Sequence, residues 1–170
     1  MRHSVFGITG WKNSGKTTLT ERLVAELSGR GWSVSTIKHA HHDFDIDIEG
    51  TDSFRHRAAG AREVAVVSGR RWALMHELRG EDEPALDAIL ERIAPCDLVL
   101  VEGYKRETHK KIEVRRLGAK DTRPLAPGDP NIVAVAADRP QPDEALPVFD
   151  VDDVAAVADF IEKTMKLTRR

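Results

Sequence analysis

The hydrophobic residues of this chain follow two spacings, one typical of strands and the other of helices. Short apolar runs of strand type cover residues 5–9, 32–37, 97–103 and 131–137. Leucines at every fourth position over 19–27 predict a helix that begins near Lys16, and apolar spacing predicts a final helix over 153–167. Strands therefore alternate with helices, which predicts an α/β fold with a mainly parallel sheet flanked by helices.

Weaker patterns predict the remaining elements. Asp52 can cap a short helix over 53–59, and Pro84 can begin another helix that Pro95 ends. Strands are also expected over 111–117 and 148–149, and residues 118–130 form a loop rich in glycine, proline and charge.

Residues 63–67 and 71–78 are two strand-like runs joined by Ser68-Gly69-Arg70, which predicts an added β-hairpin. A doubly wound sheet does not need such a hairpin. It could cover a sheet edge or pair with a second subunit, so we expect a homodimer as one hypothesis.

Composition changes this interpretation little. The chain has 170 residues, 41% of them hydrophobic and 32% charged, as expected for a single domain over 1–170. Its formal net charge of −2 gives no global field to recruit nucleic acid or an anionic membrane. Cys96 is the only cysteine, which excludes an internal disulfide and is compatible with a cytoplasmic location.

The strongest chemical signal follows the first strand, where eight residues match the phosphate-loop pattern G-x-x-x-x-G-K-S/T. These residues are Gly10, Trp11, Lys12, Asn13, Ser14, Gly15, Lys16 and Thr17. In this motif backbone N–H groups surround a polyphosphate, and the start of a helix adds partial positive charge. We expect Lys16 to reach the β- and γ-phosphates and Thr17 to be a ligand of Mg²⁺.

Glu102 ends the apolar strand 97–103 and is the candidate for the acid of a phosphate-loop protein. It could hold Mg²⁺ through water or orient an attacking water. A hydrogen-bonded acid at a strand end with no part in chemistry is the alternative.

The segment 38–52 is dense in imidazole and carboxylate groups and too polar for a core element. It contains Lys38, His39, His41, His42, Asp43, Asp45, Asp47, Gly50 and Asp52. The spacing does not match a zinc site, whereas Mg²⁺ shared with a bound nucleotide needs only one or two carboxylates. The alternative is a solvated polar loop without a ligand.

Two further candidates lie later in the chain. Lys105 and Lys111 belong to a basic run after Glu102 that is either a solvated face or a second anion site. Asp138 follows the strand 131–137, where a carboxylate can accept hydrogen bonds from guanine N1 and N2, or it is simply a turn residue.

Several of these blocks together resemble the MobB family of molybdopterin-guanine dinucleotide biosynthesis adaptor proteins. The matching residues are 10–18, 37–43 with Asp45 and Asp47, Gly50 with Asp52-Ser53, 59–61, 71–75, 98–105 and 133–138. The phosphate loop is shared by many families, whereas the Lys-His-x-His-His-Asp, Arg-Trp-Ala-Leu-Met and Val-Glu-Gly-Tyr-Lys blocks are specific.

The resemblance implies a P-loop NTPase-like fold and a dimeric GTP-binding protein with weak GTPase activity. It implies that residues 10–18, Thr18 included, hold phosphates, that Thr17 and Glu102 serve the metal, and that Asp47 and Asp52 belong to a switch-like loop. Its implied partners are the nucleotidyltransferase that joins GMP to molybdopterin and other cofactor-maturation proteins.

Our leading hypothesis is therefore a GTP-binding adaptor of molybdenum cofactor biosynthesis. One rival is a P-loop kinase of a small molecule, with Glu102 or Asp47 as base and the Lys105 to Lys111 cluster holding the acceptor. Another is a GTPase metallochaperone that binds a transition metal through His39, His41 and His42.

Overall fold

The computed structural model describes residues 3–40 and 44–169, and the chain divides into two compact units. Met1–His39 and Ile89–Arg170 form the first, which we call the sheet unit, and Ala40–Ala88 form the second, the hairpin unit. Each unit has its own architecture.

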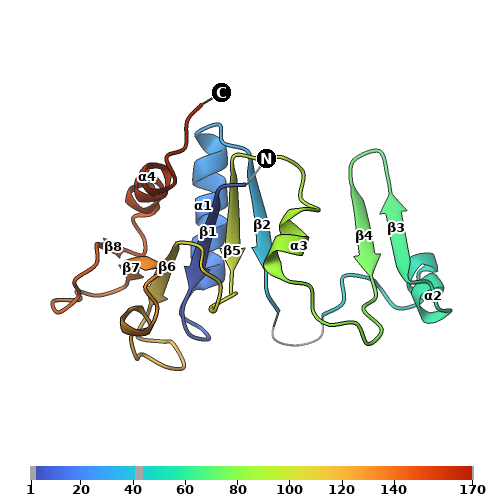
Figure 1. Ribbon diagram of the computed structural model, residues 1–170, viewed down its shortest axis with the longest axis horizontal. Coiled ribbons are helices and arrows are strands. Elements are labelled where there is room, and N and C mark those ends of the chain that lie inside the picture. The colour runs from blue at the N-terminus through green and yellow to red at the C-terminus, as the bar shows by residue number, and fades with distance from the viewer. Residues whose placement is uncertain (1–2, 41–43, 170) are drawn as a thin grey trace. The chain divides into compact units, whose positions relative to one another are not determined.

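The sheet unit contains a six-stranded sheet in which every neighbouring pair of strands is parallel (Figure 1). Its order is β2-β5-β1-β6-β7-β8, with β1 Val5–Thr9, β2 Val34–Lys38, β5 Leu98–Glu102, β6 Lys111–Arg115, β7 Ile132–Ala137 and β8 Val148–Asp150. The predicted parallel sheet is confirmed. Because β1 and β5 are parallel neighbours, the residues that follow them emerge at the same edge of the sheet.

Two helices, α1 (Lys16–Gly29) and α4 (Val154–Met165), pack with the sheet around one hydrophobic core. Strand register places Phe6 beside Leu100 and Ile8 beside Ile112, so alternate residues of several strands share this core face. The predicted stripe of α1 is confirmed, because its leucines at 19, 23 and 27 are buried in that core. Each such leucine contributes about 1.5–3 kcal/mol of hydrophobic stabilisation.

The alternate residues of β6 carry charge and are nevertheless buried. Lys111, Glu113 and Arg115 are 0%, 1% and 8% exposed. Lys111 Nζ donates to the carbonyls of Lys105 and Glu107 and to Asp129 Oδ2, the last at 3.0 Å. The ammonium that we predicted at a second anion site is therefore enclosed by the protein itself.

The helix predicted from Pro84 to Pro95 is shorter in the structure. The helix α3 covers only Leu86–Leu90, and the next turns close through bonds from the N–H of Arg92 and of Ile93 to carbonyls three residues earlier. Pro95 disfavours helical backbone at Ala94 but not over residues 91–93, where the chain forms turns in place of further α-helix. Between β6 and β7 the chain also forms a short 3-10 turn, η1, at Ala126–Gly128.

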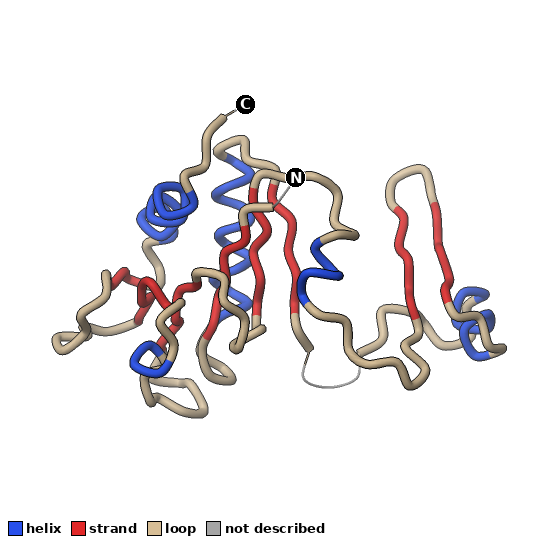
Figure 2. Tube along the Cα trace, in the orientation of Figure 1, coloured by secondary structure: helices blue, strands red, loops and turns tan. Residues whose placement is uncertain are grey.

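The hairpin unit consists of the helix α2 (Asp52–Ala58) and the antiparallel strands β3 (Glu63–Val67) and β4 (Trp72–His76) (Figure 2). The predicted hairpin is confirmed. The helix cap differs from our prediction: the Thr51 side chain, not that of Asp52, accepts a hydrogen bond from the N–H of Phe54.

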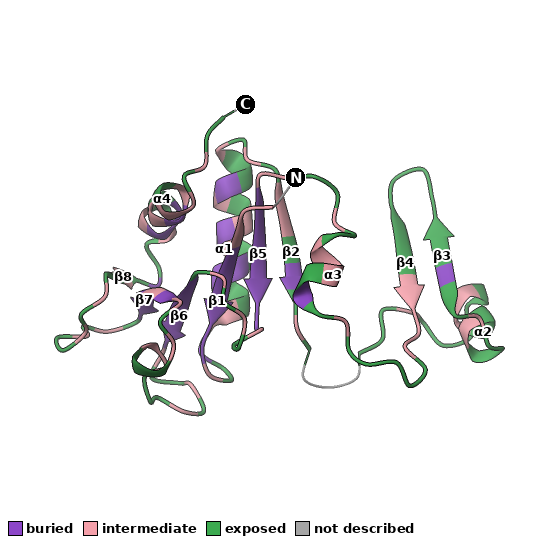
Figure 3. Cartoon of the chain, viewed as in Figure 1, coloured by how far each residue is buried: buried purple, intermediate pink, exposed green. Residues whose placement is uncertain are grey.

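Most of the hairpin is exposed, in contrast to the strands β1, β5, β6 and β7 of the sheet unit, which are mainly buried (Figure 3). Val64 is buried, whereas four large apolar residues are exposed: Val66 (46%), Val67 (74%), Trp72 (70%) and Leu74 (48%). Within the part of the chain that the structure describes, no helix has the length and apolar character needed to cross a membrane.

Candidate nucleotide-binding site

The loop between β1 and α1 has the backbone curvature that phosphate binding requires. Gly10, Asn13 and Gly15 have φ angles of 146°, 64° and 89°, so the chain turns back on itself within a few residues. A Cβ atom at Gly10 would lie 2.6 Å from the carbonyl oxygen of Val114, and one at Gly15 would lie 2.9 Å from Arg116 Nε. Gly10 is therefore required by a backbone neighbour as well as by conformation, whereas Gly15 is required by its conformation, since the Arg116 side chain can shift.

The start of α1 fits an anion. The helix begins at Lys16 with no side-chain cap at Gly15 and with no acidic residue in its first turn. Ser14 is buried, and its hydroxyl has no hydrogen-bond partner among the described residues. Helix N–H groups and a buried hydroxyl without partners need acceptors, and phosphate oxygens supply them.

The structure brings together the two side chains expected to serve the metal. Thr17 Oγ1 donates a 2.9 Å hydrogen bond to Glu102 Oε1, although 85 residues separate them in sequence. Lys38 Nζ lies 3.8 Å from the same carboxylate oxygen. A hydroxyl beside a carboxylate at the end of a phosphate loop fits the ligand chemistry of Mg²⁺.

Lys16 folds back over the loop. Its Nζ donates a 2.8 Å hydrogen bond to the carbonyl of Trp11. Burial lowers the pKa of Lys16; the Glu102 carboxylate opposes this shift, and the charges of Lys105 and Lys38 add to it. The ammonium thus lies among the loop carbonyls, where the motif places the phosphate-contacting lysine.

Trp11 fixes the first half of the loop, a role that the sequence analysis missed. Its Nε1 donates a 2.7 Å hydrogen bond to the carbonyl of Arg123, and Lys105 Nζ lies 4.5 Å from the ring centroid. The N–H of Lys120 also donates to the carbonyl of Lys12 at 2.9 Å. Because its ammonium lies over the Trp11 ring, Lys105 is placed beside the phosphate loop. A tryptophan in such a polar loop was the one sequence signal of these contacts, because its N–H needs an acceptor and its ring attracts cations.

The other predicted residues of the sheet unit lie at strand ends. The N–H of His39 donates to the carbonyl of Glu102 at 2.9 Å, and its ring lies 4.7 Å from that of Tyr104. Asp138 Oδ2 accepts a 3.0 Å hydrogen bond from the N–H of Leu117 and so joins the ends of β6 and β7. The guanine role of Asp138 stays a prediction, and His42 lies outside the described residues.

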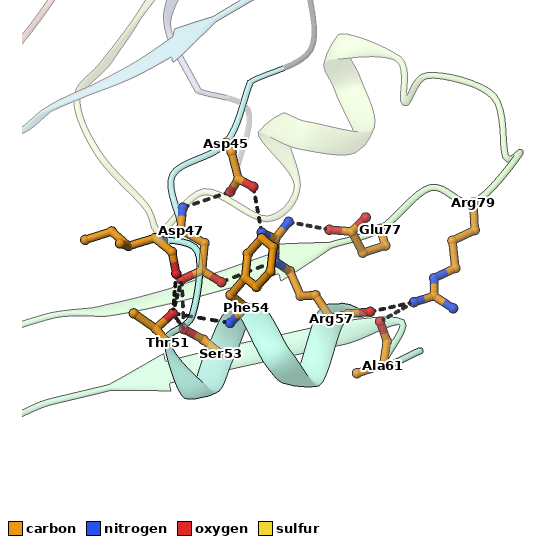
Figure 4. Close-up of polar contacts among 10 residues, drawn as sticks. Asp45, Asp47, Thr51, Ser53, Phe54, Arg57, Ala61, Glu77 and Arg79 are labelled. Atoms are coloured by element: carbon orange, nitrogen blue, oxygen red, sulfur yellow. Dashed lines mark hydrogen bonds and ion pairs between the residues drawn. The ribbon is translucent and has the colours of Figure 1, made fainter. Parts of the chain in front are cut away.

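The remaining switch-loop candidates belong to the hairpin unit, where Arg57 of α2 organises them (Figure 4). Its guanidinium contacts Asp45 at 2.7 Å, Glu77 at 2.9 Å and Asp47 at 3.3 Å. Three carboxylates around one cation hold the segment before α2 against the end of β4.

Asp47 is a structural acceptor within that cluster (Figure 4). Its Oδ1 accepts hydrogen bonds from Ser53 Oγ at 2.8 Å, from Thr51 Oγ1 at 3.1 Å and from the N–H of Ile48 at 3.1 Å. Burial opposes a lower pKa for Asp47, but these donors lower it nevertheless. Gly50 forms a turn with a φ of 88°, and the Asp52 side chain is exposed beside Arg55. The metal role of Asp47 stays a prediction.

No metal centre built from three or more His, Cys, Asp or Glu side chains occurs among residues 3–40 and 44–169. His41, His42 and Asp43 lie outside those ranges, so the histidine set proposed for a metallochaperone is not described as a whole.

Known proteins of one family are similar to this chain in sequence and in fold. The family MobB, described as molybdopterin guanine dinucleotide synthesis protein B, matches residues 5–138. The molybdopterin-guanine dinucleotide biosynthesis adapter protein of Escherichia coli K12 is 40% identical over 165 residues, which cover 95% of this chain and 93% of that protein. The adapter protein of the same name from Haemophilus influenzae is 41% identical over 161 residues, 93% of this chain and 87% of that protein. A crystal structure of a MobB protein homolog from Bacillus stearothermophilus aligns with a TM-score of 0.71 at 30% identity, covering 97% of this chain and 99% of that one.

Proposed function

Because this chain belongs to the MobB family, we propose that it is an adapter protein of molybdopterin-guanine dinucleotide biosynthesis that binds GTP and Mg²⁺ at the loop between β1 and α1. Curated relatives that match more than nine-tenths of the chain carry the adapter name. The GTP and Mg²⁺ part of the proposal is supported by the site itself.

The observation that carries the nucleotide part is the 2.9 Å contact between Thr17 and Glu102 beside a preformed phosphate loop. In the proposed complex the N–H groups of residues 10–18 and the Lys16 ammonium hold phosphate oxygens, while Thr17 and Glu102 hold Mg²⁺ directly or through water. The metal ion would neutralise phosphate charge there. Asp138, at the end of β7, would receive the guanine edge.

As an adapter, the protein would bind the nucleotidyltransferase of molybdenum cofactor biosynthesis and other cofactor-maturation proteins. An adapter needs a surface that changes when nucleotide binds. Lys38 supports this role, because it belongs to the segment 38–52 and lies 3.8 Å from Glu102, so Mg²⁺ at Glu102 would act on the start of that segment.

We also propose a homodimer that uses the β-hairpin. Val66, Val67, Trp72 and Leu74 are large, apolar and exposed on its two short strands, and such patches mark interaction surfaces in soluble proteins. A Trp72→Lys variant should shift the molar mass measured by light scattering toward that of a monomer. An unchanged dimer mass would remove the hairpin from the interface.

Titration calorimetry tests the nucleotide part. We expect GTP with Mg²⁺ to bind the wild type more tightly than ATP, and Lys16→Met to lose at least about tenfold in affinity, since it removes a charge-assisted contact with phosphate. Lys163→Met, an exposed lysine on α4, is the matched control and should bind as the wild type does. No heat with GTP, or tighter binding of ATP, would refute the assignment.

A further inference from the structure

Three lysine ammonium groups come together beside the phosphate loop. Lys16 belongs to the loop motif, and strand register pairs Lys38 of β2 with Glu102 of β5, which places Lys38 Nζ 3.8 Å from Glu102 Oε1. Lys105 follows β5. Burial lowers the pKa of Lys16, Glu102 opposes this shift, and the charges of Lys105 and Lys38 lower the pKa further. These three cations carry more charge than Glu102 alone balances, so an anion with several charges fits among them.

A tight turn after β5 carries Lys105 back toward the loop. Gly103 and Tyr104 have φ angles of 97° and 44°, so two successive residues adopt left-handed backbone. A Cβ atom at Gly103 would lie 2.9 Å from the Cβ of His39, and the ring centroids of Tyr104 and His39 are 4.7 Å apart. Left-handed backbone is unfavourable for tyrosine and persists where the surrounding structure requires it. The fold itself therefore sets the direction of the chain after Glu102.

Trp11 holds the Lys105 ammonium at this place. Lys105 Nζ lies 4.5 Å from the centroid of the Trp11 ring, while the Trp11 carbonyl accepts the 2.8 Å hydrogen bond from Lys16 Nζ. One residue of the phosphate loop thus contacts both cations. An aromatic face attracts an ammonium without pairing its charge with an anion, and the ammonium has three N–H donors. Lys105 can therefore donate to a phosphate oxygen.

The other outer lysine is balanced differently. Lys38 lies beside the Glu102 carboxylate, whereas no carboxylate of residues 3–40 and 44–169 forms an ion pair with the Lys105 ammonium. A lysine that was merely solvated could lack such a partner too. It would not need a left-handed turn that brings it over the tryptophan of the phosphate loop.

We propose that Lys105 contacts the terminal phosphate of a bound nucleoside triphosphate and makes the site prefer a triphosphate to a diphosphate. This contact presupposes the nucleotide binding proposed above and adds a residue outside the loop motif. The motif places Lys16 against the β- and γ-phosphates, and Mg²⁺ held near Glu102 would bridge the same two groups. Lys105 lies next to both residues. Its flexible stem lets the ammonium move from the ring to a γ-phosphate oxygen, which a diphosphate lacks.

Titration calorimetry of the full chain with GTP and with GDP, each with Mg²⁺, measures this preference. We expect the wild type to bind GTP at least about tenfold more tightly than GDP, since each charge-assisted contact with the terminal phosphate adds affinity. Lys105→Met should lose about tenfold in affinity for GTP and less than about twofold for GDP. Lys105→Arg keeps a cation and should keep most of the preference. Lys110→Met removes the same charge from an exposed lysine of the same segment and should bind both nucleotides as the wild type does.

The two nucleotides also separate this contact from the phosphate loop itself. Lys16→Met should weaken GTP and GDP alike, because the motif lysine reaches the β-phosphate as well. Equal affinities of the wild type for GTP and GDP overturn the role of Lys105 and leave the phosphate loop assigned. The same holds for an equal loss of both affinities in Lys105→Met, or for no loss of either. A wild type that binds neither nucleotide overturns both proposals.

Discussion

Replacing Lys111 tests how much its buried polar contacts stabilise the charged face of β6, which carries Lys111, Glu113 and Arg115. Its ammonium is fully buried and contacts two carbonyl oxygens and the Asp129 carboxylate. Lys111→Met keeps an apolar side chain that reaches about as far as the lysine Cε and removes the ammonium with its charge and its donors. The two carbonyls and Asp129 then lose a partner inside the protein, whereas the hydrophobic stem still packs.

Removing one partner of a buried ion pair costs about 3–5 kcal/mol, and we take about 3 kcal/mol because Asp129 keeps its bonds from Asn131. For a chain of this size that loss lowers the melting temperature by roughly 6–12 °C. Urea unfolding followed by circular dichroism measures the free energy directly. Lys110→Met, the exposed neighbour, is the control and should change it by less than about 0.5 kcal/mol.

An unchanged free energy of unfolding in Lys111→Met would refute the structural role. If the variant also lost affinity for phosphate or GTP while it stayed fully stable, Lys111 would be the second anion ligand that its sequence position suggested. A stability loss with unchanged GTP affinity is the result that we expect.

Further predictions concern the metal, the hairpin unit and pH. Thr17→Ala should reduce the Mg²⁺ dependence of GTP affinity severalfold in calorimetry, because the hydroxyl beside Glu102 is lost. Arg57→Met should speed hydrogen exchange over 45–58 at least tenfold, whereas exposed Arg55→Met should not. Burial, with a smaller contribution from the charge of Lys111, lowers the pKa of His109 to about 4. The unfolded chain binds the proton first, so stability should fall from about pH 6.5 to 4 and His109→Gln should flatten that fall.

The phosphate loop and its metal-binding partner could be predicted because each depends on a local signal. Loop, strand and helix follow one another within residues 5–29, and Glu102 ends a continuous apolar run. Apolar runs of this kind form central parallel strands, whose carboxyl ends share one edge. The pairing of β1 with β5 then places Thr17 within hydrogen-bond distance of Glu102.

The hydrogen bond from Trp11 to the carbonyl of Arg123 could not be predicted in the same way, because Arg123 lies 112 residues away in a loop without a sequence pattern. The charges of β6 did carry a signal that we missed. Lys111, Glu113 and Arg115 alternate in sign at every second residue of a strand, which places them together on one face. We treated Lys111 as part of a basic run that begins at Lys105.

The short elements show where local rules compete. Thr51 and Asp52 can both cap a helix, and the sequence does not decide between them. Asp47 decides in favour of Thr51 as the cap, because Asp47 accepts a hydrogen bond from the Thr51 hydroxyl while Arg57 donates to its other carboxylate oxygen. The start of α2 is thus set by contacts from residues before and after it, which a one-residue capping rule does not include.

The two faces of the central sheet are stabilised by different physical means, and this difference explains why a cavity of about 630 Å³ can exist between the segments 124–130 and 139–146. Apolar side chains of α1 and α4 pack against the core face. On the other face, loops cover β6 through Lys111, Glu113 and Arg115, and directional bonds of this kind fix a few points while they leave space between them. Proline limits the freedom of the unfolded loops and so reduces the entropy lost when they are ordered. The segments 124–130 and 139–146 are both bonded to the Arg115–Glu113 pair. They therefore keep open a volume that packed helices would have filled.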